Sequence, residues 1–221
     1  EAAAIYYENL LQKAEGKHAL KYLFDRGLSE GSIKNFRIGY APSSRNNLRK
    51  AMVLHGVSEK LMLEAGLLIK PEDPSREMYD RFRDRVIFPI SDRRGRIIAF
   101  GGRVLGNGEP KYLNSPETPL FNKGNNLYAL PQAVQAARDS ETILVTEGYT
   151  DVIALHQAGF KNAVAPLGTA LTENQIQLLW KVVAEPILCF DGDKAGQKAA
   201  QRAAERALPL LKPGKSLRFI T

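Results

Sequence analysis

The sequence predicts an α/β protein, with a mixed α/β N-terminal subdomain followed by a subdomain in which helices cover a parallel sheet. Two observations support this fold class. From residue 142 onward, short apolar runs alternate with helical segments, and such alternation is typical of a parallel sheet. Before residue 130 the pattern is different, because short helical segments lead into a predicted hairpin.

The first 70 residues are predicted to form short helices, because apolar residues recur at helical spacing and glycines end each pattern. Ser29 stands where a side chain would cap one such helix, which reaches Phe36. The apolar runs 86–90 and 97–100 flank a glycine-containing turn and predict a β-hairpin. Residues 106–126 are rich in Gly, Asn and Pro and are expected to form an irregular loop.

The C-terminal part predicts alternating strands and helices. Strands are expected over 142–145, 162–165, 187–190 and 217–220, and helices over 150–158, 172–183 and 194–211. Thr172 and Gln175 have the spacing of a capping box, which marks the start of the second of these helices. We therefore expect a division into residues 1–130 and 141–221, with residues 131–140 as a connecting helix.

Acidic residues follow two of these predicted strands. Glu147 comes directly after the first strand, and Asp191 and Asp193 come directly after the third. Ligands bind outside the carboxyl ends of parallel strands, so these side chains would face one crevice if the two strands are neighbours. Asp151 would lie in the first turn of the helix that follows Glu147. Converging carboxylates need a cation, and hard oxygen ligands suit Mg²⁺, so the pattern predicts a site where two ions could assist phosphoryl transfer.

The same acidic residues also have a structural interpretation. An Asp-Gly-Asp sequence after a strand can be a plain turn in which an aspartate caps the next helix, and Glu147 could simply begin a loop. The metal-site interpretation is favoured because the two motifs occupy equivalent positions in one alternating unit.

The formal net charge of the chain is +7, and arginine is concentrated in one segment. That segment contains Arg81, Arg83, Arg85, Arg93, Arg94, Arg96 and Arg103. If the first three lie on one strand, their guanidiniums share a face and suit phosphate groups. The alternative is a solvated edge strand whose charges discourage aggregation. Clustered arginines favour a phosphate-bearing partner such as a nucleic acid.

Two segments, 145–151 and 190–196, closely resemble the Toprim domain shared by bacterial primases, topoisomerases and some nucleases. The resemblance implies that Glu147, Asp191 and Asp193 bind a divalent metal and serve catalysis. It makes Asp151 an auxiliary metal ligand. Mg²⁺ is the expected ion, and Mn²⁺ is a possible substitute.

Further segments resemble bacterial DNA primases in particular, and the resemblance covers essentially the whole chain. They are the basic motif at 81–90 and the segments 101–103, 110–118, 120–124 and 127–128. This implies an RNA polymerase core that makes short primers on single-stranded DNA from ribonucleoside triphosphates. The residues expected to bind nucleic acid or triphosphate are Arg81, Arg83, Arg85, Arg103, Lys111, Tyr112 and Lys123. Tyr112 could instead have a packing role.

Full-length members of this family carry a zinc-binding domain before this region and a helicase-binding domain after it. We therefore expect a monomeric fragment without zinc, which would meet the replicative helicase only through a domain that it lacks. Cys189 is the only cysteine, which favours a reducing, cytoplasmic setting at the bacterial replication fork. The chain contains no run of 18 apolar residues, so no membrane partner is expected.

Two other functions remain open from the sequence. One is a Toprim-type nuclease or a topoisomerase fragment, although a topoisomerase would need a nucleophilic tyrosine on another domain. The other is a non-catalytic module that binds single-stranded nucleic acid. In such a module, changing Asp191 would leave nucleic-acid binding intact and metal ions would have no effect on it.

Overall fold

The computed structural model describes residues 1–168 and 170–220, and the chain divides into two compact units. Unit 1 comprises Glu1–Ile90 and Arg96–Phe121. Unit 2 comprises Ser91–Gly95 and the chain from Asn122 onward. Two clusters of buried hydrophobic side chains divide between the units in the same way, so each unit has a core of its own.

Unit 1 combines short helices with an antiparallel sheet. Its helices are α1 (Ala2–Leu11), η1 (Ala14–Gly16), α2 (Lys17–Asp25), α3 (Glu30–Asn35), α4 (Asn47–Leu54) and α5 (Glu59–Glu64). Its strands are β1 (Gly39–Ala41), β2 (Leu68–Ile69), β3 (Tyr79–Asp80), β4 (Arg85–Ser91), β5 (Ile97–Val104) and β6 (Tyr112–Asn114). The predicted cap at Ser29 is confirmed, because its hydroxyl accepts a hydrogen bond from the backbone N–H of Ser32.

The main sheet of unit 1 has the strand order β1-β4-β5-β6, and β2 pairs separately with β3. The predicted hairpin is confirmed by β4 and β5, and Gly95 takes the positive φ of 77° that its turn requires. Two expectations were wrong. The first 70 residues also contain β1, which pairs with β4, and the segment 106–126 contains β6, which pairs with β5. Both strands are only three residues long and are held by tertiary hydrogen bonds, so no local period reveals them.

Unit 2 alternates strands with helices. Its helices are η2 (Lys123–Asn125), α6 (Leu130–Asp139), α7 (Tyr149–Gln157), α8 (Glu173–Trp180), α9 (Lys194–Ala207) and η3 (Leu208–Leu210). Its strands are β7 (Leu144–Val145), β8 (Ala163–Val164), β9 (Ile187–Cys189) and β10 (Arg218–Ile220).

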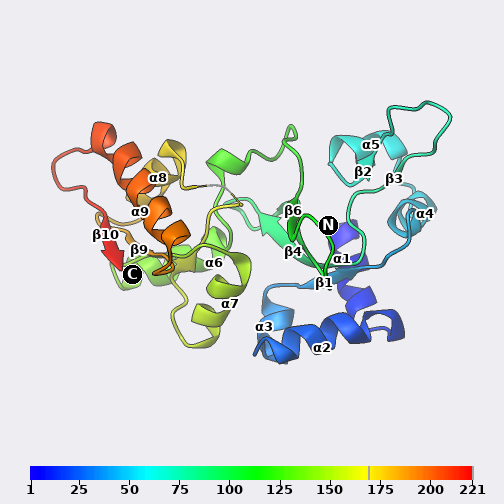
Figure 1. Cartoon of the computed structure of the whole chain (residues 1–221), viewed down its shortest axis with the longest axis horizontal. Coiled ribbons are helices and arrows are strands. Elements are labelled where there is room, and N and C mark those ends of the chain that lie inside the picture. Colours follow the sequence, from blue (N-terminus) through cyan, green and yellow to red (C-terminus); the bar gives the residue numbers. More distant parts are fainter. Residues whose placement is uncertain (169, 221) are drawn as a thin grey trace. The chain divides into compact units, whose positions relative to one another are not determined.

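The sheet of unit 2 has the order β10-β9-β7-β8, and every neighbouring pair is parallel. Helices α6 to α9 gather around it (Figure 1). This confirms the predicted parallel sheet with covering helices. The capping box at Thr172 is also confirmed, since its side chain accepts from the N–H of Gln175 and the Gln175 side chain accepts from the N–H of Thr172.

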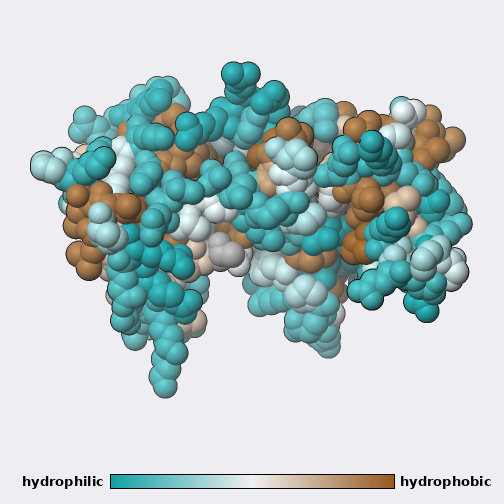
Figure 2. All heavy atoms as spheres, turned by 90° about the horizontal axis from the view of Figure 1, so that it is seen from above, coloured by the Kyte–Doolittle hydropathy of each residue, from teal (hydrophilic) through white to brown (hydrophobic). Residues whose placement is uncertain are grey.

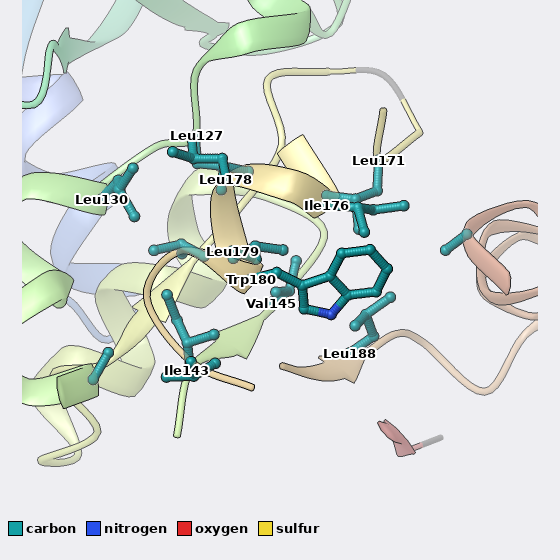
Figure 3. Packing of buried hydrophobic residues seen from close by; sticks show 14 of the residues in the cluster. Leu127, Leu130, Ile143, Val145, Leu171, Ile176, Leu178, Leu179, Trp180 and Leu188 are labelled. Carbon is teal, nitrogen blue, oxygen red and sulfur yellow. The ribbon is translucent and has the colours of Figure 1, made fainter. Parts of the chain in front are cut away.

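The core of unit 2 is built from the inner faces of these helices and strands. Trp180 lies at the end of α8 among the side chains of Ile176, Val145 and Leu188 (Figure 3). Its indole N–H donates to the backbone carbonyl of Ser216 at 2.9 Å, which ties α8 to the segment leading into β10. Packing of this kind holds the strand ends, and therefore the residues that follow them, in fixed positions.

Hydrophilic residues dominate the face drawn in Figure 2, and hydrophobic residues form separate patches on it. Within residues 1–168 and 170–220, the helices are too short or too polar for any of them to cross a membrane.

Candidate functional site

Glu147 and Asp191 meet at one edge of the parallel sheet. Strands β7 and β9, which precede them, are paired neighbours, with Val145 opposite Leu188. The backbone N–H of Asp191 donates a hydrogen bond to Oε1 of Glu147 at 2.9 Å. The two acidic motifs, which are far apart in sequence, therefore lie side by side at the carboxyl ends of adjacent strands.

Asp193 is the N-cap of α9. Its Oδ1 accepts hydrogen bonds from the N–H groups of Ala195 and Gly196, both at 2.8 Å. A side chain at Gly196 would overlap the carbonyl oxygen of Asp191, so glycine allows the Asp191 turn to close against the start of the helix. The capping role foreseen as the structural alternative thus applies to Asp193, and it uses one of the two carboxylate oxygens.

Asp151 lies in the first turn of α7, as expected. Neighbouring groups remove part of its hydration, and this desolvation raises the pKa of the carboxyl group. The negative charge of Asp191 raises this pKa further. Asp151 and Asp191 are therefore close enough to repel each other, which concentrates negative potential at this edge of the sheet.

The residues at this edge fit a hard divalent cation. Within the described part of the chain, no three His, Cys, Asp or Glu side chains are already grouped closely enough to hold a metal. However, Mg²⁺ usually takes only one or two carboxylates and fills its other positions with water and phosphate oxygens. The exposed side chains of Glu147 and Asp191 supply that number, and the charge of Asp191 already acts on Asp151.

A cavity of about 260 Å³ adjoins Glu147 within unit 2. Phe190, Leu171 and Arg202 of α9 are among its lining residues. Arg206, one helical turn beyond Arg202, donates to the carbonyl oxygens of Ala170 and Leu171 and so holds the cavity wall. Neither arginine was singled out from the sequence, because only the docking of α9 brings them to this edge.

Arg81, Arg83 and Arg85 do not lie on one strand, so the row of guanidiniums that a shared strand would produce does not form. Strand β4 begins only at Arg85, so Arg81 and Arg83 lie in the preceding loop. Arg81 donates to the carbonyl of Asn114, and Arg83 donates to the carbonyl of Asp80. Arg85 is only 6% exposed and donates to the carbonyl of Gly102. The three guanidiniums donate to three different carbonyl groups, and the turn at Asp84, whose φ is +50°, separates Arg85 from the two arginines before it.

Arg103 is also buried, with 7% of its surface exposed. Its guanidinium lies 5.0 Å from the ring centroid of Tyr22 and 5.5 Å from that of Tyr112. Arg26 lies 5.5 Å from the Tyr22 ring, which extends the stack. Tyr112 and Arg103 are paired across β6 and β5. Tyr22 and Arg26 were not predicted as part of this cluster, because the helical spacing of residues in α2 gives no sign of an arginine that is distant in sequence.

Lys111 and Lys123 have different settings. Lys111 is exposed just before β6, and its carbonyl accepts from Val104 N–H and from Arg85. Lys123 begins η2 in unit 2, and its carbonyl accepts a hydrogen bond from the buried amide of Gln175 at 2.9 Å. Both lysines are therefore anchored through their backbones.

Comparison with known proteins places this site in a family. A family model described as "Toprim domain" matches residues 141–221, so unit 2 corresponds to a Toprim-type α/β domain. A second model, "DNA primase catalytic core, N-terminal domain", matches residues 6–134. The chain belongs to the DNA primase family.

Curated relatives agree with this assignment. A DNA primase of Pseudomonas aeruginosa is 53% identical over 220 residues, which are 99% of this chain and 33% of that protein. The DNA primase of Escherichia coli K12 is 48% identical over 215 residues, which are 97% of this chain and 37% of that protein. The chain thus spans about a third of the length of these relatives.

Solved structures agree as well. A crystal structure of a DNA primase domain from Pseudomonas aeruginosa matches with a TM-score of 0.92 and 52% identity, covering 99% of this chain and 68% of that one. A structure of the DnaG primase catalytic domain bound to single-stranded DNA matches with a TM-score of 0.88 and 47% identity, covering 98% and 67%.

Proposed function

We propose that this chain is part of the RNA polymerase core of a DNA primase, which copies single-stranded DNA into short RNA primers. The reaction is nucleotidyl transfer, in which a 3′-hydroxyl attacks the α-phosphate of a ribonucleoside triphosphate and pyrophosphate leaves. The observation that supports it is the contact between Glu147 and Asp191 at adjacent strand ends, in a chain of the DNA primase family.

Glu147, Asp191 and Asp193 are the proposed catalytic carboxylates and would hold Mg²⁺, or Mn²⁺ in its place, with Asp151 as an auxiliary ligand. Two such ions, when bound, neutralise charge on the attacking and leaving oxygens of a phosphoryl transfer. The hydrogen bond between Asp191 and Glu147 holds one carboxylate in place before any ion arrives. Preorganisation of this kind lowers the cost of assembling a charged site.

The proposed nucleic-acid and triphosphate contacts are Arg81, Arg83, Arg85, Arg103, Lys111, Tyr112 and Lys123. The buried Arg85 and Arg103 would act mainly by holding the strands and rings that present their exposed neighbours. A DNA partner is supported by the related primase domain solved with single-stranded DNA. Association with a replicative helicase through other parts of the protein, a monomeric state and a place at the cytoplasmic replication fork belong to the same proposal.

The test is ribonucleotide incorporation on single-stranded DNA with Mg²⁺ or Mn²⁺, using a longer piece of the protein beside its Asp191→Asn variant. Template-dependent RNA that disappears in the variant supports the polymerase and its carboxylates together. Cleavage of the DNA that depends on Asp191, without RNA synthesis, would support a Toprim nuclease instead. A protein that shows neither RNA synthesis nor DNA cleavage but still binds DNA would support a non-catalytic binding module.

A further inference from the structure

Arg202 and Arg206 lie one helical turn apart in α9, but their settings differ. Arg206 donates to the carbonyl oxygens of Ala170 and Leu171, at 3.1 and 2.6 Å. Arg202 is exposed and lines the cavity of about 260 Å³ beside Glu147. Within residues 1–168 and 170–220, Arg202 takes part in no ion pair. Arg206 therefore builds the cavity wall, whereas the charge of Arg202 is available to a ligand.

The cavity carries one negative and one positive group. Among its described lining residues, Glu147 is acidic and Arg202 is basic, and the others are apolar residues and glycine. Glu147 and Arg202 do not pair with each other in the described part of the chain, so the space between their charged groups is open. The wall includes Phe190, and an apolar wall screens charges less than water does.

Helix α9 holds Arg202 in a fixed position relative to the acidic edge. Asp193 caps the helix through the N–H groups of Ala195 and Gly196, and Asp191 is bonded to Glu147. Side chains of a helix lean toward its N-terminus. The side chain of Arg202 therefore extends from α9 back toward the edge at which the carboxylates lie, and the same elements that position the carboxylates position the guanidinium.

This pair of charges selects the kind of ligand. A free anion would be attracted by Arg202 and repelled by Glu147, and a free cation would meet the opposite forces. A complex of a divalent cation with phosphate groups has a positive and a negative end, so it complements both side chains. Mg²⁺ binds one or two carboxylates together with phosphate oxygens, and the planar donor fork of arginine matches phosphate.

The size of the cavity favours a compact ligand. Its volume of about 260 Å³ is below the range of about 300–1,000 Å³ that is usual for drug-sized ligands. A whole nucleotide is therefore less suitable than its phosphate groups alone.

We propose that Arg202 and this cavity bind a magnesium-bound diphosphate group. This inference rests on the proposed function, in which a diphosphate group is present in the incoming triphosphate and leaves as pyrophosphate. Both sources have the same chemistry, and the experiment separates them. Arg202 is then a binding residue for the leaving group, contributed by α9 from the side of the sheet edge on which the cavity lies.

The experiment is isothermal titration calorimetry of the intact protein with pyrophosphate, in Mg²⁺ and in EDTA. The wild type should bind pyrophosphate in Mg²⁺ and at least about tenfold more weakly in EDTA. Arg202→Gln should weaken binding in Mg²⁺ about tenfold, as expected for loss of a hydrogen bond between charged groups, and Arg202→Lys should lose less. Because Arg202 is exposed, the Tm of both variants without ligand should stay within about 2 °C of wild type.

Lys198→Gln is the matched control. It removes a positive charge from an exposed position of the same helix that does not line the cavity, and it should bind pyrophosphate like wild type. Repeating the titration with an α,β-methylene nucleoside triphosphate separates the two sources. Weaker binding of both ligands by Arg202→Gln would support one subsite for the triphosphate tail and the product, and weaker binding of pyrophosphate alone would support a product site.

Wild-type affinity of Arg202→Gln for pyrophosphate in Mg²⁺ would overturn the inference. Weaker binding of oligothymidylate in EDTA, with unchanged pyrophosphate binding, would also overturn it and would assign Arg202 to nucleic acid. Calorimetry requires no RNA synthesis. A wild-type protein that binds pyrophosphate through Arg202 but makes no primer would therefore contradict the proposed function and leave this inference standing.

Discussion

The backbone N–H of Asp191 donates to Oε1 of Glu147 at 2.9 Å, and this bond joins the residues that follow two neighbouring parallel strands. The donor is a backbone group, so the bond does not depend on the side chain of Asp191. Glu147→Gln keeps an oxygen acceptor at the same place. Amide substitutions at these two positions therefore change charge while leaving the local geometry almost intact.

We expect Glu147→Gln and Asp191→Asn each to lower primer synthesis by about 100-fold or more, because each removes a charge that would hold a catalytic cation. Their melting temperatures without metal should stay within about 2 °C of wild type. Added Mg²⁺ should raise the Tm of the wild type only. Gel analysis of RNA products and scanning fluorimetry would check this, and full activity in either variant would contradict the carboxylate assignment.

Asp193 allows capping to be separated from catalysis. Asp193→Asn keeps an N-cap oxygen for the N–H groups of Ala195 and Gly196, whereas Asp193→Ala removes it. Loss of such a cap costs about 1 kcal/mol. We expect the alanine variant to be less stable by about that amount in urea unfolding, the asparagine variant to unfold like wild type, and both to lose primer synthesis. An active asparagine variant would show that Asp193 is only a cap.

Gln175 should be one of the most sensitive positions in unit 2. Its side chain is fully buried, donates to the carbonyls of Lys123 and Asn126, and accepts from the N–H of Thr172. Gln175→Leu removes these three part-buried hydrogen bonds at once, and we expect a loss of roughly 3 kcal/mol in the free energy of unfolding. Asn174→Ala, which removes only an exposed bond to Asn125, is the control and should cost less than about 0.5 kcal/mol.

His156 should make the stability of unit 2 sensitive to mild acid. Its Nε2 lies 2.9 Å from the carbonyl oxygen of Ala163, and burial lowers the pKa of the imidazole below 6.5. The folded state therefore favours the neutral ring, so stability is greatest above pH 6.5 and falls as the pH drops through the lowered pKa. We expect the wild-type Tm to fall from pH 7.5 to 5.5 and His156→Gln to reduce that fall.

His55→Gln changes an exposed imidazole and is the matched control for this measurement. It should keep the pH dependence of the wild type. If the Tm of His156→Gln falls as much on acidification as that of the wild type, protonation of this imidazole on unfolding does not cause the loss of stability in acid.

Local signals in the sequence were enough to predict the parallel sheet and the position of the acidic residues on it. Strand, helix and cap signals in residues 142–220 are local, because the period of apolar residues and the capping hydrogen bonds act over a few positions. Glu147 and Asp191 follow their strands within the same short motifs. If the two strands are neighbours, the two acidic motifs must lie close together, so their proximity could be predicted from the sequence.

The contacts of the arginines, in contrast, depend on the tertiary fold. Arg81 and Arg83 lie in a loop, and Arg85 and Arg103 are buried against carbonyl groups and tyrosine rings. Arg45 comes to lie over Tyr79 because Asp80 binds its backbone from a distant part of the chain. An arginine side chain is long and flexible, so its partners are the carbonyls, rings and carboxylates that the fold brings within its reach. The local periodicity of the sequence contains no information about these partners.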